Sequence, residues 1–156
     1  MKLSDLLSEK YIIPSLKSHH KEDVINELID LFKGDPKVTD LEKVRTAVMD
    51  REKIMSTGVG KNFAIPHGKT NAVNDIICAF GRSDQPIDYQ SLDSQPVHLV
   101  FLIVGKDNMV STHIKLLSRI SRMMTKDAFR EKLLKQNSVH GIISDFREEE
   151  SGYFEL

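Results

Sequence analysis

One histidine of this sequence stands in a setting suited to chemistry. His67 follows Pro66 and precedes Gly68. The proline fixes its own φ and keeps Ile65 extended, while the glycine leaves room for a ligand or another stretch of backbone. A neutral imidazole is a competent nucleophile near pH 7, because its pKa is about 6.5. If a backbone carbonyl binds one ring N–H, the other nitrogen keeps a free lone pair. His67 is therefore a candidate nucleophile, with a plain turn as the alternative.

A second histidine, His113, lies where a helix is expected to begin, within the segment 110–114. A helix N-terminus carries partial positive charge and free N–H groups, so it favours a neutral imidazole and a nearby anion. From the residues alone, an exposed histidine in the first turn is the favoured interpretation. The other histidines are expected on the surface or packed in a strand: His19, His20, His98 and His140.

Several common sites are excluded by spacing. Gly60-Lys61 is followed by Asn62, so the glycine-rich run 56–60 is not a P-loop, and no G-x-G-x-x-G occurs. No H-x-x-x-H or C-x-x-C pair is present, so we expect neither a metal site nor a cofactor. The single cysteine, Cys78, stands in an apolar run and is expected to be a small buried hydrophobe.

Helices are predicted on both sides of this region. Apolar spacing predicts an amphipathic helix over 20–33. Thr39-Asp40-Leu41-Glu42 matches a capping box with Thr39 as N-cap, and its helix is expected to end near Arg51. In the C-terminal part, Ile114, Leu117 and Ile120 share one buried stripe, and two further helical stripes follow.

Strands are predicted between those helices, over residues 63–66, 76–80 and 97–104. The run 97–104 is continuous and rich in β-branched residues, as in a central strand covered on both faces. The connection 87–96 carries turn residues and no long helix, which favours an antiparallel pairing. We therefore predict an α/β fold, a mixed β-sheet sandwiched between helices, in a single domain.

Composition agrees with an ordinary globular chain. Its 156 residues are 40% hydrophobic and 29% charged, with a net charge of −1, which implies no affinity for nucleic acid. There is no apolar run long enough for membrane insertion and no apolar leader, so a cytoplasmic protein is expected. The predicted division is a domain over residues 1–150 and a C-terminal tail, 151–156, and the end of the chain from Arg147, REEESGYFEL, is expected to be exposed and partly ordered.

Two segments together resemble a known family. S-T-G-V-G at 56–60 and A-I-P-H-G at 64–68 are similar to the active-site motif of type-2 enzyme IIA domains. These domains belong to the bacterial phosphoenolpyruvate:sugar phosphotransferase system, in the fructose–mannitol and nitrogen-regulatory class. The resemblance extends over nearly the whole chain, including 97–104 and 113–117. It implies an α/β sandwich with a mixed sheet.

The resemblance also implies roles for individual residues. His67 would be phosphorylated at Nε2, and His113 and Arg51 would stabilise the phosphoryl group. Arg51 can offer a planar set of donors, although a cation at the end of a helix also complements the helix dipole. Ser56 and Thr57 are candidate phosphate contacts. Met55, Val59 and Phe63 are candidates for the partner surface around His67, although Phe63 is equally a core residue.

The implied partners are the phosphocarrier HPr as donor, and either a IIB domain or regulatory target proteins as recipients. Stand-alone length and the opening residues 3–7, LSDLL, favour a nitrogen-regulatory relative. A fructose–mannitol IIA component of sugar uptake is the alternative. A non-catalytic module that binds a ligand or a protein remains as a third reading, which explains the glycines but not Arg51, His67 and His113 together.

Overall fold

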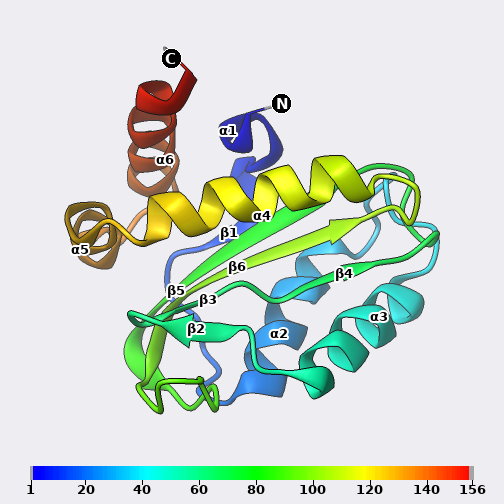
Figure 1. Ribbon diagram of the computed structural model, residues 1–156, viewed down its shortest axis with the longest axis horizontal. Helices are drawn as coiled ribbons and strands as arrows, with labels where there is room; N and C mark the ends of the chain where they lie inside the picture. Colours follow the sequence, from blue (N-terminus) through cyan, green and yellow to red (C-terminus); the bar gives the residue numbers. More distant parts are fainter. Residues whose placement is uncertain (1, 155–156) are drawn as a thin grey trace.

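A six-stranded mixed sheet lies between two layers of helices in the computed structural model, which describes residues 2–154 (Figure 1). The strand order is β1-β5-β6-β3-β2, and β4 pairs with β6 beside β3. The strands are β1 Ile12–Ile13, β2 Gly58–Gly60, β3 Phe63–Ala64, β4 His67–Lys69, β5 Ile77–Ile87 and β6 Val97–Gly105. The predicted fold class, a mixed sheet between helices, is confirmed.

The central pair of strands explains why both faces of the sheet need cover. β5 and β6 are antiparallel, as the turn-rich connection predicted, with Phe80 opposite Phe101. Side chains of a strand alternate between its faces. Along β6, Leu99, Phe101 and Ile103 enter one core, while the residues between them enter the other. Because β6 is apolar from Leu99 to Val104, both of its faces pack against a helix layer.

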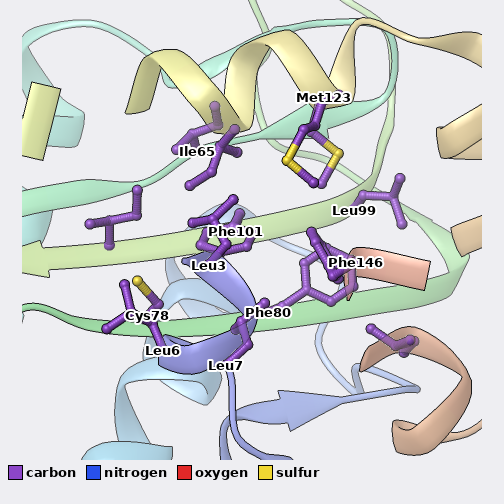
Figure 2. Packing of buried hydrophobic residues seen from close by; sticks show 14 of the residues in the cluster. Leu3, Leu6, Leu7, Ile65, Cys78, Phe80, Leu99, Phe101, Met123 and Phe146 are labelled. Carbon is purple, nitrogen blue, oxygen red and sulfur yellow. The ribbon is translucent and has the colours of Figure 1, made fainter. Parts of the chain in front are cut away.

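The first layer contains α4 Val110–Met124, which crosses one face of the sheet (Figure 1). It is joined there by α1 Leu3–Leu6, α5 Asp127–Lys135 and α6 Val139–Phe154. Phe146 of α6 packs edge-on against Phe80, Phe101 and Phe129, with ring centroids 5.1–5.7 Å apart (Figure 2). Cys78 is buried in the same cluster, and desolvation raises its pKa to about 12, so the predicted role as a small hydrophobe is confirmed.

The second layer contains α2 Lys21–Ile29 and α3 Leu41–Ile54 on the opposite face (Figure 1). The predicted helix over 20–33 is found as α2 and the short 3-10 helix η2 Asp30–Phe32. A second 3-10 turn, η1 Glu9–Tyr11, leads into β1. No helix among residues 2–154 has both the length and the apolar character needed to cross a membrane.

The predicted capping box is wrong by one residue. Asp40, not Thr39, is the N-cap of α3, because its carboxylate accepts the backbone N–H groups of Glu42 and Lys43. The Thr39 hydroxyl instead donates to the carbonyl of Ala72, 3.0 Å away. The helix also continues beyond the predicted end near Arg51 and stops at Ile54.

The C-terminal prediction needs correction at Glu150. Helix α6 runs through residue 150 to Phe154, and Glu150 is buried. Its carboxylate accepts hydrogen bonds from the backbone of Leu3 and the hydroxyl of Ser4. This acid therefore ties the N-terminal turn to the last helix. The rest of the expected tail, residues 155–156, lies outside the described residues.

Candidate functional site

His67 begins β4, where the strand runs parallel to β6 opposite Ile103. Its Nδ1 lies 2.8 Å from the carbonyl oxygen of Ile65. Because a carbonyl can only accept, Nδ1 carries the proton and Nε2 keeps the lone pair. Burial is the main cause that lowers the pKa of His67, and the charges of Arg51 and Lys69 add to it. The half-buried ring is therefore neutral near pH 7 and presents Nε2.

Gly68 serves the packing of α3 rather than a ligand. A Cβ at this position would lie 3.1 Å from the backbone nitrogen of Val48 and 3.2 Å from the carbonyl carbon of Ala47. These distances are tighter than ordinary van der Waals contact. The glycine thus lets the helix backbone approach β4, and that approach brings the end of α3 beside His67.

His113 lies in the first turn of α4, as predicted, but it is buried, so the interpretation as an exposed histidine is wrong. Its ring centroid is 5.7 Å from that of His67. Burial, followed by the charges of His67 and Lys69, lowers the pKa of His113 to about 4. Among residues 2–154 neither of its ring nitrogens has a hydrogen-bond partner. Buried polar atoms without partners are rare in folded proteins and point to a group that binds there.

The burial of His113 also changes the predicted stripe of α4. Leu116, Ile120, Met123 and His113 face the core, whereas Ile114 is 59% exposed. A glycine makes room for the histidine, because a Cβ at Gly105 would lie 2.6 Å from the Nδ1 of His113. The sequence analysis missed Gly105, whose only signal is that a glycine ends an otherwise apolar strand.

Arg51 occupies the last turn of α3 and is half-buried. Its Nη1 donates to the carbonyl of Met55, 2.9 Å away, which satisfies the end of the helix. Its charge also acts on His67. Among the described residues no other hydrogen bond of this guanidinium is found, so most of its donors are available. Both predicted interpretations of Arg51, helix-end cation and anion contact, are compatible with this position.

The two predicted hydroxyls lie in different surroundings. Ser56 is half-buried, and its Oγ accepts the backbone N–H of Gly58 at 3.2 Å, which leaves the hydroxyl proton for another acceptor. Thr57 is buried and donates its hydroxyl to Glu52. The proton of Thr57 is therefore already used inside the protein.

Glu52 is a residue that the sequence analysis missed. Its buried carboxylate accepts the backbone N–H and hydroxyl of Thr57 and the hydroxyl of Tyr89, and it pairs with Lys21 at 3.2 Å. It follows Arg51 directly, so the two side chains leave the helix in directions about 100° apart. One feature of the sequence could have indicated Glu52: it is an acid directly beside an arginine that was predicted to be functional.

Apolar side chains surround the two histidines. Met55 and Val59 are 57% and 54% exposed, as the predicted partner surface requires. Phe63 is wrong as a member of that surface, because it is 3% exposed and belongs to the core under α4. Three further apolar side chains, all from helices, are exposed: Ile54 at the end of α3, and Val110 and Ile114 near the start of α4. Among the described residues no group of three or more potential metal ligands occurs.

Comparison with known proteins gives consistent matches. The family model "Phosphoenolpyruvate-dependent sugar phosphotransferase system, EIIA 2" matches residues 5–148. The PTS system fructose-specific EIIABC component of Bacillus subtilis is 39% identical over 92% of this chain, which spans only 22% of that relative's length. A nitrogen regulatory protein of Bradyrhizobium diazoefficiens is 34% identical over 92% of the chain and 94% of that protein.

Solved structures agree. The nitrogen regulatory protein IIA-Ntr of Neisseria meningitidis superposes with a TM-score of 0.86 at 25% identity, covering 92% of this chain and 98% of that one. Enzyme IIA mannitol of Escherichia coli, solved in complex with phosphorylated enzyme IIB mannitol, has the same fold, with a TM-score of 0.78 at 20% identity over 91% and 97% of the chains. The chain therefore belongs to the EIIA 2 family of the phosphoenolpyruvate-dependent sugar phosphotransferase system and is a phosphotransferase component of that system.

Proposed function

We propose that His67 is the residue through which this phosphoryl carrier works, accepting the group at Nε2 from phosphorylated HPr. One observation carries the proposal. The free Nε2 of His67 belongs to a ring 5.7 Å from the ring of His113, a buried imidazole whose nitrogens have no partner among residues 2–154. A phosphoryl oxygen bound between the rings would supply the acceptor that His113 lacks.

The transfer exchanges one N–P bond for another. The Nε2 lone pair of His67 attacks phosphorus while the bond to the donor imidazole breaks, and that electron pair returns to the donor. Such transition states are loose, and charge spreads over three equatorial oxygens. Groups placed in advance to stabilise that charge supply most of the catalysis.

Arg51 and His113 are the proposed stabilising groups. Arg51 offers charged N–H donors from the end of α3, and the neutral imidazole of His113 offers one N–H from the start of α4. Ser56 can add its hydroxyl. We do not include a donated hydrogen bond from Thr57, since its hydroxyl already donates to Glu52.

The partner surface is proposed to be the exposed apolar rim around His67, formed by Met55, Val59, Ile54, Val110 and Ile114. Donor and recipient must reach the same imidazole, so they would use this rim in turn rather than together. A small interface of this kind suits a transient complex. The complex of a fold relative with phosphorylated IIB supports a IIB domain as one class of recipient.

For the recipient, we propose a regulatory role first, in which target proteins bind according to the phosphorylation state of His67. The 0.86 superposition on a nitrogen regulatory protein supports it. Donation to a IIB domain in sugar uptake is the second candidate, supported by the 39% identity to a fructose-specific component. Either role places the protein in the cytoplasm.

The phosphorylation site can be tested directly. Incubation with phosphoenolpyruvate, enzyme I and HPr should add one acid-labile phosphate to the wild type and none to His67→Ala. His140→Ala is the matched control, since the side chain of His140 is 82% exposed and its one contact with an acid among residues 2–154 is with Glu9. Label retained by His67→Ala would contradict the assignment.

The two recipient roles can then be separated. Phosphorylated protein is mixed with IIB domains of the same cell, and loss of its label is followed in time. Rapid transfer supports sugar uptake. A label that persists, together with a protein complex that forms with only one phosphorylation state, supports regulation.

A further inference from the structure

We propose that Glu52 is a positioning residue for His67, acting through a relay of three consecutive hydrogen bonds that runs along the backbone of two segments. The inference rests on the proposed role of His67 as phosphoryl acceptor. It assigns to a buried acid, which does not reach the reacting atoms, the task of holding the imidazole in place and acting on its charge through space.

The relay is continuous from carboxylate to ring. Glu52 Oε2 accepts the N–H of Thr57 at 2.7 Å. The carbonyl of Thr57 accepts the N–H of Ile65 at 3.1 Å. The carbonyl of Ile65 lies 2.8 Å from Nδ1 of His67. The N–H and the C=O of Thr57 belong to different peptide groups, as do those of Ile65, so these bonds fix the positions of the two segments in turn, while the charge of Glu52 acts on His67 through space.

The Glu52 carboxylate has several polar partners. It accepts two groups of Thr57 and the hydroxyl of Tyr89, and it pairs with Lys21 from α2. Its side chain is 5% exposed and that of Lys21 is 14% exposed. A buried charge is tolerated when it is paired and hydrogen-bonded in this way. The arrangement therefore holds the Glu52 side chain in one place behind the loop that carries Ser56 and Thr57.

Charges of both signs face His67. Arg51 of α3 and Lys69 of β4 lower its pKa, and Glu52 raises it, while His113 of α4 lies across from the ring. When Nε2 forms its bond to phosphorus, the ring gains positive charge and Nδ1 keeps its proton on the Ile65 carbonyl. No proton has to move. A negative charge at the far end of the relay stabilises the ring in that state without competing for the phosphoryl group.

The test compares a substitution of Glu52 itself with a substitution of Tyr89, whose hydroxyl donates to the Glu52 carboxylate. Glu52→Gln keeps the shape and removes the charge, whereas Tyr89→Phe removes one hydrogen bond and keeps the charge. The readouts are the ¹⁵N resonances of the His67 ring during a pH titration and the single-turnover rate of phosphorylation by phospho-HPr. We expect Glu52→Gln to lower the pKa of His67 and to slow transfer about tenfold, the lower end of what losing a carboxylate behind a functional histidine does at metal sites.

Tyr89→Phe should leave both readouts near those of the wild type. Glu52→Gln leaves Lys21 without its acid, so the double variant Glu52→Gln with Lys21→Gln is measured as well if the single variant unfolds. The double variant should again lower the pKa of His67, because Glu52 and not Lys21 is among the charges that act on the ring.

Three outcomes would overturn the relay. The first is an unchanged pKa of His67 in folded Glu52→Gln or in the double variant. The second is an equal effect of Glu52→Gln and Tyr89→Phe at matched thermal stability, which makes Glu52 a structural anchor only. The third is a neutral wild-type ring protonated at Nε2. The nuclear magnetic resonance readouts need no phosphoryl donor, so a wild type that accepts no phosphate contradicts the proposed function without deciding the relay.

Discussion

Two imidazoles with different surroundings define the site at the scale of residues. His67 has one nitrogen bound to a carbonyl and the other available, whereas His113 has both nitrogens buried without a partner among residues 2–154. The arrangement of His67 suits a nucleophile, and that of His113 suits an imidazole that donates its N–H to a bound anion. Arg51 adds the positive charge that neither neutral ring supplies.

The first prediction concerns Arg51. Arg51→Ala should slow phosphorylation by phospho-HPr by about 100-fold, since removal of one donor aimed at the charge of a transition state has an effect of that order. Arg51→Lys should restore only part of the rate, because an ammonium lacks the planar set of donors. Arg45→Ala is the control on the same helix, since Arg45 binds Asn26 and Asp30 instead. Equal single-turnover rates for Arg51→Ala and Arg45→Ala would remove the proposed role.

The second prediction concerns His113. His113→Phe keeps a buried ring but has no N–H, so the fold should persist while transfer slows by about 10–100-fold. Rapid-quench measurement of the label on His67 provides the rate, and circular dichroism checks the fold. His98→Phe is a comparison at a histidine bound to the carbonyl of Ser83. A wild-type rate in His113→Phe would show that the buried imidazole takes no part.

At the scale of elements, three segment ends meet at the site. The last turn of α3 brings Arg51 and Glu52, the start of β4 brings His67, and the first turn of α4 brings His113. Two glycines allow these segments to pack closely together. Gly68 lets the α3 backbone lie against β4, and Gly105 leaves the space that the ring of His113 fills. Side-chain chemistry at the site thus depends on backbone approach elsewhere.

The third prediction tests that dependence at Gly105. Gly105→Ala places a methyl group where the Nδ1 of His113 lies only 2.6 Å away, so the ring must shift. We expect transfer to slow about tenfold, by the loss of one well-placed donor. The free energy of unfolding should fall by about 1–3 kcal/mol, as for other overpacked sites. Gly152→Ala is the matched control, since no atom of the described part of the chain lies within 4 Å of a Cβ at that position. If both variants transfer at the wild-type rate, the position of His113 does not depend on Gly105.

At the scale of the whole molecule, the fold keeps two histidines neutral by burying them beside cations. A histidine whose pKa is lower in the folded than in the unfolded chain makes stability depend on pH. As pH falls, the histidine is protonated first in the unfolded chain, because its pKa is higher there. Stability from this source is therefore complete above about pH 6.5 and is lost as pH falls toward the folded pKa, which for His113 is about 4.

The fourth prediction follows from that sign. The free energy of unfolding should decrease as pH falls from about 7 to 4, and His113 should account for on the order of 3 kcal/mol of the decrease. Urea unfolding of the wild type and of His113→Phe at several pH values separates this contribution from that of the carboxylates. The variant should show the shallower dependence. Parallel curves would mean that His113 titrates normally in the folded protein.

Local pattern was enough for the framework and for the central residue. Unbroken apolar character predicted β6 between two helix layers, and the Pro-His-Gly segment singled out His67. Errors arose where neighbours in space compete with local preference. Thr39 bonds to Ala72 rather than capping α3, and Glu150 is buried because it binds the N-terminal turn.

The sequence by itself determined what repeats at short range: the period of each strand and helix, and the proline and glycine that flank His67. Only the tertiary structure decided that His113 is buried beside His67, that Phe63 is core, and that Glu52, Tyr89 and Lys21 converge. The physical reason is separation along the chain. Lys21, Glu52 and Tyr89 come from segments far apart in the chain, and their contacts follow from burial that no local spacing encodes.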